Sequence, residues 1–399
     1  MKVRLRRLVF LVFVSCATIW IVTWLHSGTV IYDINTLMSS HGHVQYSTEN
    51  KSVKQDIQCV GAGPDEAEDL FCMERPQYLP NFKNPCWYAK EDGLLRLKCV
   101  PYYHILGVAK SGTTDLSYRI RAHKDVLGCN GCFHNKEIFY WCRRRYGYEH
   151  SMKKGAACDF GCFQQMFTTA AQHIERTTTE TGYHNMITGE ATPEDFCDFR
   201  CWSYIPQNAG LEKPVVTTPH LMRHVYADPK FIIILRNPTD RLYSDYMMRI
   251  GRSPEDFHEA VSHDLQIEEN CMRNHTVEHC LYSLEIGRKL RTYIFLGCYS
   301  VYMREWLKVF PRERFLILRT DDYDKDLKSQ LRKVYDFLKL DYTEDWLTSI
   351  SSVRHINVGT KNSKIPMLEK TRVLLDGFYN RYNQDLADIL QDNMFLWLT

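Results

Sequence analysis

The sequence predicts an α/β fold with a mostly parallel sheet, helices on both faces of that sheet, and an N-terminal transmembrane helix. Three observations support this prediction. From residue 102 onward, apolar strand-like runs alternate with helix-like stretches; a glycine-framed loop joins the first run to the first helix; and a long uncharged stretch lies near the N-terminus. Alternating strands and helices are typical of a parallel sheet that helices cover on both sides. At 399 residues, the chain is long enough for one large domain or two ordinary ones.

Four apolar runs predict the strands, at Tyr102–Val108, Met186–Ala191, Phe231–Leu235 and Phe315–Leu318. Seven stretches predict helices: Thr113–His123, Gln164–Arg176, Asp240–Ile250, Glu255–His263, Ile286–Val309, Leu327–Leu340 and Lys370–Gln391. No internal repeat is evident.

The N-terminus predicts a membrane anchor. Four cations in residues 1–7 precede Leu8–Leu25, an uncharged stretch of 18 residues, and the next charged side chain is Asp33. A helix of that length spans about 27 Å, close to the apolar thickness of a bilayer. Residues 1–7 are therefore expected to stay cytoplasmic, residues 8–25 to form a signal anchor, and the rest to lie on the far side. A cleaved signal peptide is the alternative, but its apolar core is usually shorter.

Composition divides the remainder into a polar stem at 26–56, a cysteine-rich segment at 57–100 and the main domain at 101–399. Cys16 lies in the expected anchor, which leaves fourteen cysteines, an even number, for an oxidising compartment. Close pairs are Cys129/Cys132, Cys158/Cys162, Cys197/Cys201 and Cys271/Cys280. Zinc sites normally need a second matching pair, so disulfides are favoured, although spacing alone does not fix the connectivity. Sequons predict glycosylation at Asn50 and Asn274.

Net charge excludes one class of partner. Apart from the four N-terminal cations, 46 Lys and Arg balance 48 Asp and Glu. The main part of the chain is therefore not basic overall, which argues against nucleic-acid binding. An anionic partner must be held by local clusters.

The glycine-framed loop is Gly107-Val-Ala-Lys110-Ser111-Gly112-Thr113-Thr114. It is P-loop-like, because both glycines and the final hydroxyl fit the pattern G-x-x-x-x-G-K-[ST], but Thr113 stands where the lysine is expected. Backbone N–H groups and the start of a helix still form an anion cradle, and Lys110 supplies the cation from within the loop. The loop predicts a phosphate-bearing cofactor.

A second site follows the strand Phe231–Leu235. That strand ends in Arg236, and Ser244 follows eight residues later on the next predicted helix. Ligands of open α/β sheets bind at the carboxyl ends of strands. An arginine there suits a phosphate rather than a metal ion, so Arg236 and Ser244 are expected to hold one.

These two segments resemble the cofactor signatures of sulfotransferases, which use 3′-phosphoadenosine 5′-phosphosulfate (PAPS). The resemblance implies that Lys110 to Thr114 hold the 5′-phosphosulfate, while Arg236 and Ser244 hold the 3′-phosphate. The stretch Asn357–Lys364, with Thr360, Lys361 and Lys364, is similar to the late loop that closes over the nucleotide in Golgi and heparan-type members. Pro80–Tyr88 and the wider cysteine pattern resemble the N-acetylgalactosamine 4-sulfate 6-O-sulfotransferase branch.

The resemblance also implies a general base. The segment from His134 to Trp141 is similar to the Lys-Glu-x-x-Phe segment of membrane-bound sulfotransferases, with Tyr140 in place of the phenylalanine. Glu137 is then the expected base for the acceptor hydroxyl. Glu190, at the end of the second strand, is the competing candidate, and His134 is a weaker third. The structural alternative is that Glu137 only pairs with Lys136 or Arg143.

Charge suggests how the acceptor is held. Lys136, Arg143, Arg144 and Arg145 are expected to contact an anionic polysaccharide, with Trp141, Tyr146 and Tyr148 interspersed as surfaces for sugar rings. The expected reaction is an in-line displacement at sulfur in which Lys110 neutralises the leaving oxygen, with no metal required.

The sequence therefore predicts a Golgi type II membrane sulfotransferase that acts on the 6-hydroxyl of N-acetylgalactosamine in chondroitin or dermatan sulfate. A homodimer is one option for its assembly. An enzyme directed at heparan or uronic acid hydroxyls is one alternative. From other classes, the alternatives are a lumenal nucleotide-dependent kinase and a non-catalytic glycan-binding protein.

Overall fold

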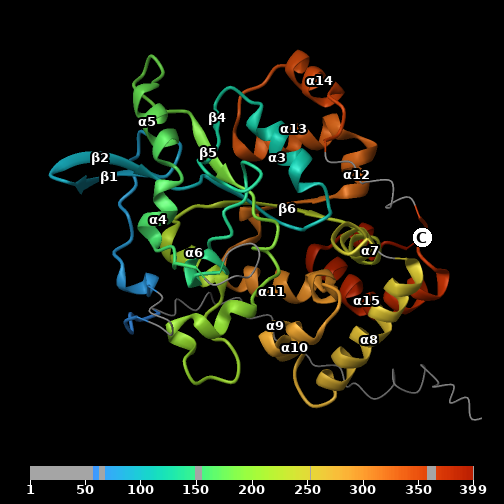
Figure 1. Cartoon of the computed structure of the whole chain (residues 1–399). Helices are drawn as coiled ribbons and strands as arrows, with labels where there is room; N and C mark the ends of the chain where they lie inside the picture. The colour runs from blue at the N-terminus through green and yellow to red at the C-terminus, as the bar shows by residue number, and fades with distance from the viewer. Residues whose placement is uncertain (1–56, 63–67, 149–154, 252, 357–364, 399) are drawn as a thin grey trace, which may run out of the picture. The chain divides into compact units, whose positions relative to one another are not determined.

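A five-stranded parallel sheet forms the centre of the structure (Figure 1). Its order is β4-β5-β3-β6-β7, with bounds β3 Tyr103–Gly107, β4 Val126–Leu127, β5 Ile187–Glu190, β6 Lys230–Leu235 and β7 Phe315–Arg319. Neighbouring strands pair in parallel register, as in Ile105 with Ile232. The four predicted strands are confirmed. Strand β4 was not predicted, because two residues are too short to show a pattern.

The computed structural model describes residues 57–62, 68–148, 155–251, 253–356 and 365–398. All of them belong to one of two compact units, Lys54–Thr399. The expected cytoplasmic tail, membrane anchor and stem, together with Asn50, lie outside the described residues. Among the helices within these ranges, none has the length and apolarity to cross a bilayer.

Helices cover both faces of the sheet, as the sequence predicts. Along β6, Phe231, Ile233 and Leu235 face one buried core, and Ile232 and Ile234 face another. The first core contains side chains of α6 (Thr218–Val225), α7 (Pro238–Arg249), α11 (Tyr299–Val309) and α15 (Glu369–Leu390). The second contains side chains of α3 (Thr113–Arg121), α13 (Leu327–Leu338) and α14 (Glu344–Ser352). Figure 1 shows these two groups of helices on opposite sides of β6.

Most predicted helices form, with shifted ends. The predicted Gln164–Arg176 is divided into α4 (Phe160–Gln165) and α5 (Thr168–Arg176). The predicted Glu255–His263 is the first half of α8 (Pro254–Met272), which a capping box at Ser253 and Asp256 begins. Four short helices were not predicted: α6, α14, α9 (Val277–Tyr282) and α12 (Thr320–Lys325).

The prediction of one long helix at Ile286–Val309 is wrong. The structure has α9 (Val277–Tyr282), α10 (Leu284–Lys289), a 3₁₀ turn at Ile294–Gly297 and then α11. The reason lies in α8, where the Asp264 carboxylate accepts hydrogen bonds from the backbone N–H groups of Arg291 and Thr292, at 2.8 and 2.7 Å. These N–H groups are therefore not available to a continuous helix.

The cysteine-rich segment contains structure that the sequence analysis did not predict. An antiparallel hairpin, β1 (Cys86–Glu91) and β2 (Leu94–Cys99), is closed by a disulfide between its end residues. The 3₁₀ turn Leu70–Cys72 precedes it, and a second disulfide joins Cys72 to Cys59. The hairpin packs against α5 beside the sheet.

The preference for disulfides over zinc is confirmed. In the described part of the chain, six disulfides form: Cys59–Cys72, Cys86–Cys99, Cys129–Cys132, Cys142–Cys201, Cys158–Cys162 and Cys271–Cys280. The closely spaced Cys197 and Cys201 do not bond to each other, since Cys201 bonds to Cys142, 59 residues earlier. Cys197 and Cys298 are free and buried.

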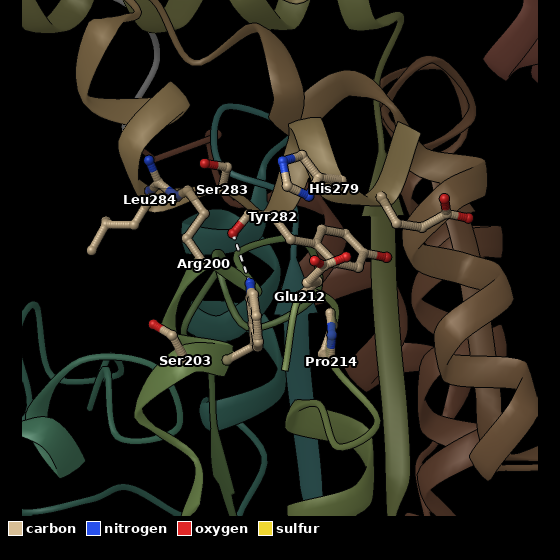
Figure 2. A pocket seen from close by; sticks show the side chains of 10 residues that line it. Arg200, Ser203, Glu212, Pro214, His279, Tyr282, Ser283 and Leu284 are labelled. Carbon is tan, nitrogen blue, oxygen red and sulfur yellow. Dashed lines mark hydrogen bonds between the residues drawn. The ribbon is translucent and has the colours of Figure 1, made fainter. Parts of the chain in front are cut away.

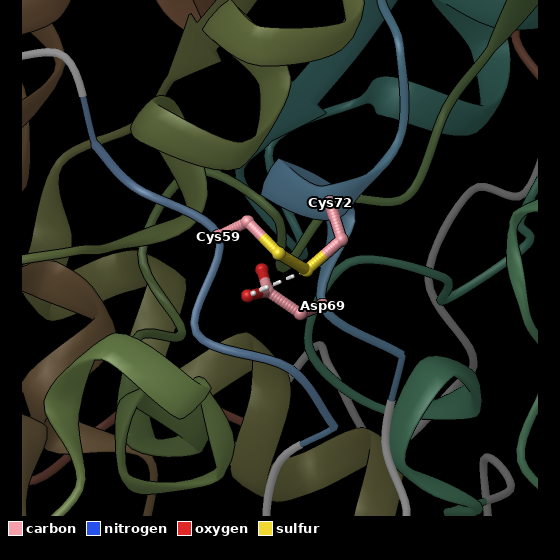
Figure 3. A group of neighbouring side chains, drawn as sticks. All are labelled: Cys59, Asp69 and Cys72. Atoms are coloured by element: carbon pink, nitrogen blue, oxygen red, sulfur yellow. Dashed lines mark hydrogen bonds between the residues drawn. A yellow bond between two sulfur atoms is a disulfide. The ribbon is translucent and has the colours of Figure 1, made fainter.

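One cluster in the described residues has the composition of a metal site, and its bonding excludes that role. Cys59, Asp69 and Cys72 lie together (Figure 3). Their two sulfurs form a disulfide and are not thiolates. The Asp69 carboxylate instead accepts from the N–H groups of Val60 and Phe71, at 2.8 and 3.0 Å.

Candidate active site

The strand order reverses at the centre of the sheet, between β3 and β6. Strands β3 and β6 are neighbours, but the chain runs from β3 toward β4 on one side and from β6 to β7 on the other. In open α/β sheets, ligands bind outside the carboxyl ends of the strands at such a point. The loop with Lys110 follows β3, and Arg236 follows β6, so both predicted cofactor segments begin here.

The loop after β3 has the backbone conformation of a tight turn before a helix. Lys110 and Gly112 have φ angles of +72° and +98°, in the left-handed region, and Gly112 is the N-cap of α3. Glycine adopts this conformation without steric cost. It also offers no side chain to cap the helix, so the first N–H groups of α3 have no side-chain acceptor and can bind an anion.

Two contacts bring the predicted cofactor segments together. The Arg236 guanidinium donates from Nη1 to the backbone oxygen of Lys110, at 3.3 Å. Thr320, which begins α12 after β7, has its hydroxyl 2.9 Å from the Ser111 carbonyl oxygen and 3.1 Å from the Leu235 carbonyl oxygen. Lys110 and Arg236 therefore lie at one edge of the sheet, as the sequence analysis expected.

The Lys110 ammonium lies among charges from α7. Its Nζ is 3.0 Å from the sulfur of Met248. Burial lowers the pKa of Lys110, Asp245 acts to raise it, and Arg236 and Arg249 lower it further. A lysine held this way loses its proton more readily than a free lysine.

The remaining residues of the loop fit an anion site. Ser111 is fully buried, and its hydroxyl has no hydrogen-bond partner. Thr113 is buried and Thr114 half-buried at the start of α3. Ser244 is half-buried in α7, two turns after Arg236. A buried hydroxyl without a partner is costly unless a ligand satisfies it.

Thr360, Lys361 and Lys364 lie outside the described residues, but the described residues on either side of them contact helices of the site. The N–H of Ile356 donates to the Asp115 carboxylate of α3 at 2.9 Å. The Ile365 carbonyl accepts from the hydroxyl of Tyr243, next to Ser244 in α7, at 2.9 Å. Ile356 is thus held by the helix of the first predicted cofactor site, and Ile365 by the helix of the second.

The two candidate bases lie on neighbouring segments. Glu137 is 8% exposed and forms an ion pair with Lys136, which is the structural alternative that the sequence analysis named. Glu190 is 2% exposed; one oxygen accepts from the Thr192 hydroxyl, and the other lies 3.5 Å from His104. The N–H groups of Ile138 and Phe139 both donate to the Thr192 hydroxyl, at 3.1 and 3.0 Å, which holds the two segments together. His134 is exposed.

The expected basic surface for an acceptor does not form as predicted, because most of its cations are buried. Lys136, Arg143 and Arg145 are 3%, 8% and 1% exposed. Their charges meet internal partners: Glu137 for Lys136, Glu194 for Arg143 and the Glu68 carbonyl for Arg145. Of this group, Arg144 is half-buried.

The expected stacking surface needs a similar correction. Trp141 and Tyr146 are core residues, and Tyr148 is half-buried with its hydroxyl 2.8 Å from that of Tyr204. Trp141 and Tyr146 therefore do not present free rings to a sugar.

A cavity of about 140 Å³ lies between the 3₁₀ turn Arg200–Tyr204 and helices α9 and α10 (Figure 2). Trp202, Glu212, His279 and Leu284 are among its lining residues. None of the residues that line it is among the expected cofactor or catalytic residues.

Comparison with known proteins decides the family. The model of the family described as "Sulfotransferase domain" matches residues 103–372, from β3 to α15. The chain belongs to the sulfotransferase family. The match begins at the strand before the Lys110 loop and includes both cofactor segments, so the fold and the site belong to the same domain.

Three relatives show how far the likeness extends. Carbohydrate sulfotransferase 15 of Rattus norvegicus and of Homo sapiens are each 28% identical over 383 residues, covering 83% of this chain and 67% of the relative. Membrane-associated sulfotransferase kil1 of Dictyostelium discoideum is 20% identical over 367 residues, covering 76% and 67%. A solved sulfotransferase from Alicyclobacillus acidocaldarius has a TM-score of 0.47 at 20% identity and covers 73% of this chain and 96% of its own.

Some residues of this sulfotransferase site were not predicted from the sequence. Thr320, Asp245 and Met248 all contact the Lys110 loop or lie beside the Lys110 ammonium. Thr320 had a usable signal, because a hydroxyl follows the predicted strand Phe315–Leu318 within two residues. The two α7 residues had none beyond their closeness to Arg236 in the sequence.

Proposed function

We propose that this sulfotransferase transfers the sulfuryl group of PAPS to a hydroxyl of a glycosaminoglycan. The favoured acceptor is the 6-hydroxyl of 4-sulfated N-acetylgalactosamine in chondroitin or dermatan sulfate. The main observation in favour is the contact of the Arg236 guanidinium with the Lys110 loop across two adjacent strand ends, since the two phosphate-bearing ends of PAPS need two cationic sites. Relatives named carbohydrate sulfotransferase 15 support a carbohydrate acceptor.

The proposed roles follow from the chemistry of each group. The acceptor oxygen attacks sulfur, and the bond from sulfur to the bridging phosphate oxygen breaks. Lys110 neutralises the charge that grows on that oxygen, and the N–H groups of Ser111 to Thr114 hold the 5′-phosphate. Arg236 and Ser244 hold the 3′-phosphate, with Thr360, Lys361 and Lys364 from the later segment.

Glu137 is proposed to take the proton from the acceptor hydroxyl. Its carboxylate is less buried than that of Glu190, which already accepts from Thr192. Glu190 is then the residue that positions the base segment, because its carboxylate also accepts from the N–H of Ile138, at 3.3 Å. No step of this mechanism requires a metal ion.

We also propose the cellular setting. Residues 8–25 anchor the chain in the Golgi membrane with its main domain in the lumen, where the six disulfides form readily and Asn50 and Asn274 are glycosylated. The Dictyostelium relative is named a membrane-associated sulfotransferase, which agrees with this setting.

The decisive experiment supplies the lumenal fragment with ³⁵S-labelled PAPS and a panel of desulfated and sulfated chondroitin, dermatan and heparan chains. Product disaccharides identify the sugar and the hydroxyl. We expect label on the 6-hydroxyl of 4-sulfated N-acetylgalactosamine. Label only on heparan or uronic acid would contradict the favoured acceptor, and glycan binding without donor turnover would indicate a glycan-binding protein. A requirement for Mg²⁺ and ATP would indicate a kinase.

A further inference from the structure

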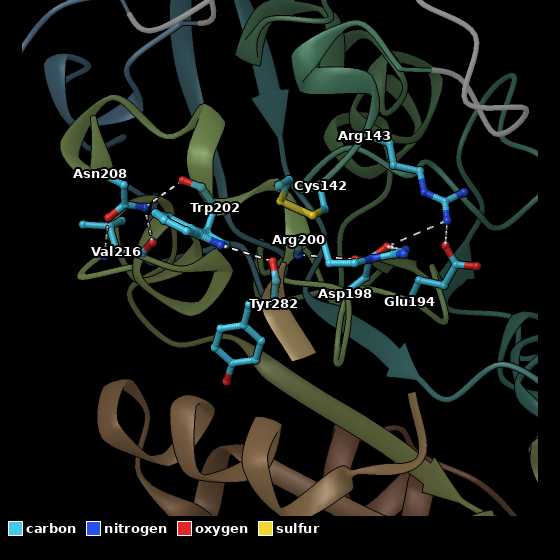
Figure 4. Close-up of a disulfide and its surroundings, with 10 residues drawn as sticks. Cys142, Arg143, Glu194, Asp198, Arg200, Trp202, Asn208, Val216 and Tyr282 are labelled. Atoms are coloured by element: carbon cyan, nitrogen blue, oxygen red, sulfur yellow. Dashed lines mark hydrogen bonds and ion pairs between the residues drawn. A yellow bond between two sulfur atoms is a disulfide. The ribbon is translucent and has the colours of Figure 1, made fainter. Parts of the chain in front are cut away.

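Six side chains of alternating charge run from the Lys110 site toward the segment that carries Glu137. We call them the charge ladder, and its members, in order, are Asp245, Arg249, Glu194, Arg143, Asp198 and Arg200. Figure 4 shows the part from Glu194 to Arg200 beside the disulfide Cys142–Cys201. Four members, Asp245, Glu194, Arg143 and Asp198, are at most 8% exposed.

Arg249 occupies the end of the ladder nearest to Lys110. It lies in the last turn of α7, with its Nε donating to the Asp245 carboxylate at 2.9 Å and its Nη2 3.4 Å from Glu194. Its guanidinium carbon is 4.7 Å from the ring centroid of Tyr293. These contacts fix the guanidinium on three sides, while 29% of the side chain stays exposed.

Glu194 joins the two halves of the ladder. One of its oxygens faces Arg249, and the other accepts from Arg143. Arg143 in turn lies 5.1 Å from the ring centroid of Phe139, two residues after Glu137. A single buried carboxylate therefore connects the helix beside Lys110 to the segment of the proposed base.

The ladder is too tightly packed to be a binding site. The cavity among Phe139, Arg143, Thr192, Glu194, Asp195 and Asp198 measures about 10 Å³. That volume holds no more than one water molecule. The buried charges therefore act on each other and on the neighbouring site, not on a ligand in the cavity.

We propose that Arg249 and Glu194 are positioning residues for sulfuryl transfer. Arg249, held between Asp245 and Glu194, sets the electrostatic surroundings of the Lys110 ammonium and fixes them relative to the Glu137 segment. This inference rests on the proposed function, since it assigns a role within that reaction.

The charges that act on Lys110 make the inference testable by pH. They are Asp245, Arg236 and Arg249, all in α7 or directly before it; Asp245 raises the pKa of Lys110, whereas the two arginines lower it. Loss of the Lys110 proton at high pH should end transfer, because the neutral amine cannot stabilise the leaving oxygen. Removing either partner of the Asp245–Arg249 pair should then shift the alkaline limit of activity, in opposite directions.

The experiment measures kcat/KM for PAPS against pH. We expect Arg249→Gln to move the alkaline limit to higher pH and Asp245→Asn to move it to lower pH, while Arg249→Lys keeps it near the wild-type value. The matched control is Arg372→Gln, which breaks a different ion pair of α7. In the wild type, the Nη2 atom of Arg372 lies 2.6 Å from the Asp240 carboxylate. Arg372 is not among the charges that shift the pKa of Lys110, so the alkaline limit of activity should not move in this variant.

A second measurement tests the connection to the Glu137 segment. Glu194→Gln should lower kcat about tenfold or more while the KM for PAPS changes less than about threefold, because misplacement of reacting groups mainly affects the chemical step. The double variant Glu194→Gln/Arg249→Gln should be no slower than the slower single variant, since the two residues act through one contact.

The outcomes separate this inference from the proposed function. A wild-type protein that transfers sulfate to none of the acceptors contradicts the proposed function. An active wild type whose alkaline limit stays fixed, or moves the same way in the Arg249 and Asp245 variants, contradicts the positioning role alone. If Arg249→Gln fails to fold, the folded Asp245→Asn variant still decides the direction: a limit that does not move to lower pH contradicts the positioning role.

Discussion

At the scale of single residues, Lys110 is the group whose chemistry matters most. It occupies a left-handed position in the loop after β3, beside Met248 and within reach of Asp245. We expect Lys110→Ala to lower kcat by about 10²–10³-fold, the usual cost of removing one group that stabilises a developing oxyanion. Steady-state kinetics with labelled PAPS measures this loss, and circular dichroism confirms the fold. Wild-type turnover in a folded variant would rule out the role.

The two buried glutamates call for a paired test. Glu137→Gln should lower kcat while affinity for the desulfated nucleotide stays the same, because the amide cannot accept the proton. Glu190→Gln should mainly lower the free energy of unfolding, because its carboxylate accepts two hydrogen bonds inside the protein. Calorimetric titration and urea unfolding separate the two effects. The reverse pattern would assign the base to Glu190.

The structure brings the predicted donor-site residues together but buries most of the predicted acceptor residues, for a physical reason. Lys110 and Arg236 follow strands that a continuous apolar run reveals, and parallel strands place their carboxyl ends together. The burial of Arg143 and Arg145 depends on partners 51 and 77 residues away, Glu194 and Glu68. No local pattern shows such partners, so a run of three arginines resembles an exposed surface.

At the scale of elements, the start of α7 determines where Arg236 points. Asn237 caps this helix, with its side-chain oxygen accepting from the N–H groups of Thr239 and Asp240, at 2.9 and 3.3 Å. We expect Asn237→Ala to reduce the free energy of unfolding by about 1 kcal/mol and to raise the KM for PAPS. Urea unfolding and initial rates measure the two quantities.

The control for this prediction is Thr343→Ala, which removes the cap of α14, where the Thr343 hydroxyl accepts from the N–H of Trp346 at 3.1 Å. It should cost a similar free energy and leave the KM for PAPS unchanged. Equal KM values in both variants would mean that the cap of α7 does not position Arg236.

Element boundaries show the same division between local and distant causes. The helices with a clear amphipathic period, such as α13 and α15, were predicted within a few residues. The break between α10 and α11 was missed because it depends on Asp264 of α8, a tertiary contact. The hairpin β1–β2 was missed because its short strands alternate only weakly and its cysteines dominated the pattern.

At the scale of the whole molecule, the disulfide Cys142–Cys201 should contribute most to the free energy of unfolding among the six disulfides of the described residues. It closes a loop of 59 residues and lies beside the charge ladder, whereas Cys129–Cys132 spans 3 residues. By chain entropy, the first should contribute about 4 kcal/mol and the second about 1.5 kcal/mol. The double variants Cys142→Ala/Cys201→Ala and Cys129→Ala/Cys132→Ala, compared by urea unfolding, test this. Similar losses in both would contradict the entropic account.

The strand order has a consequence for how the enzyme is made. The proposed nucleotide site needs the loop after residue 107, the end of β6 at residue 235 and the hydroxyl of Thr320, three pieces spread over more than half of the chain. During synthesis, the loop after β3 emerges first and cannot form the site until the other two pieces have been made. Such distant pairings also slow folding, because a long loop must close before the contact forms. A nascent chain that stops within α8 therefore contains both cations but lacks the strand and hydroxyl that fix them, so donor binding is one of the last properties that this protein acquires.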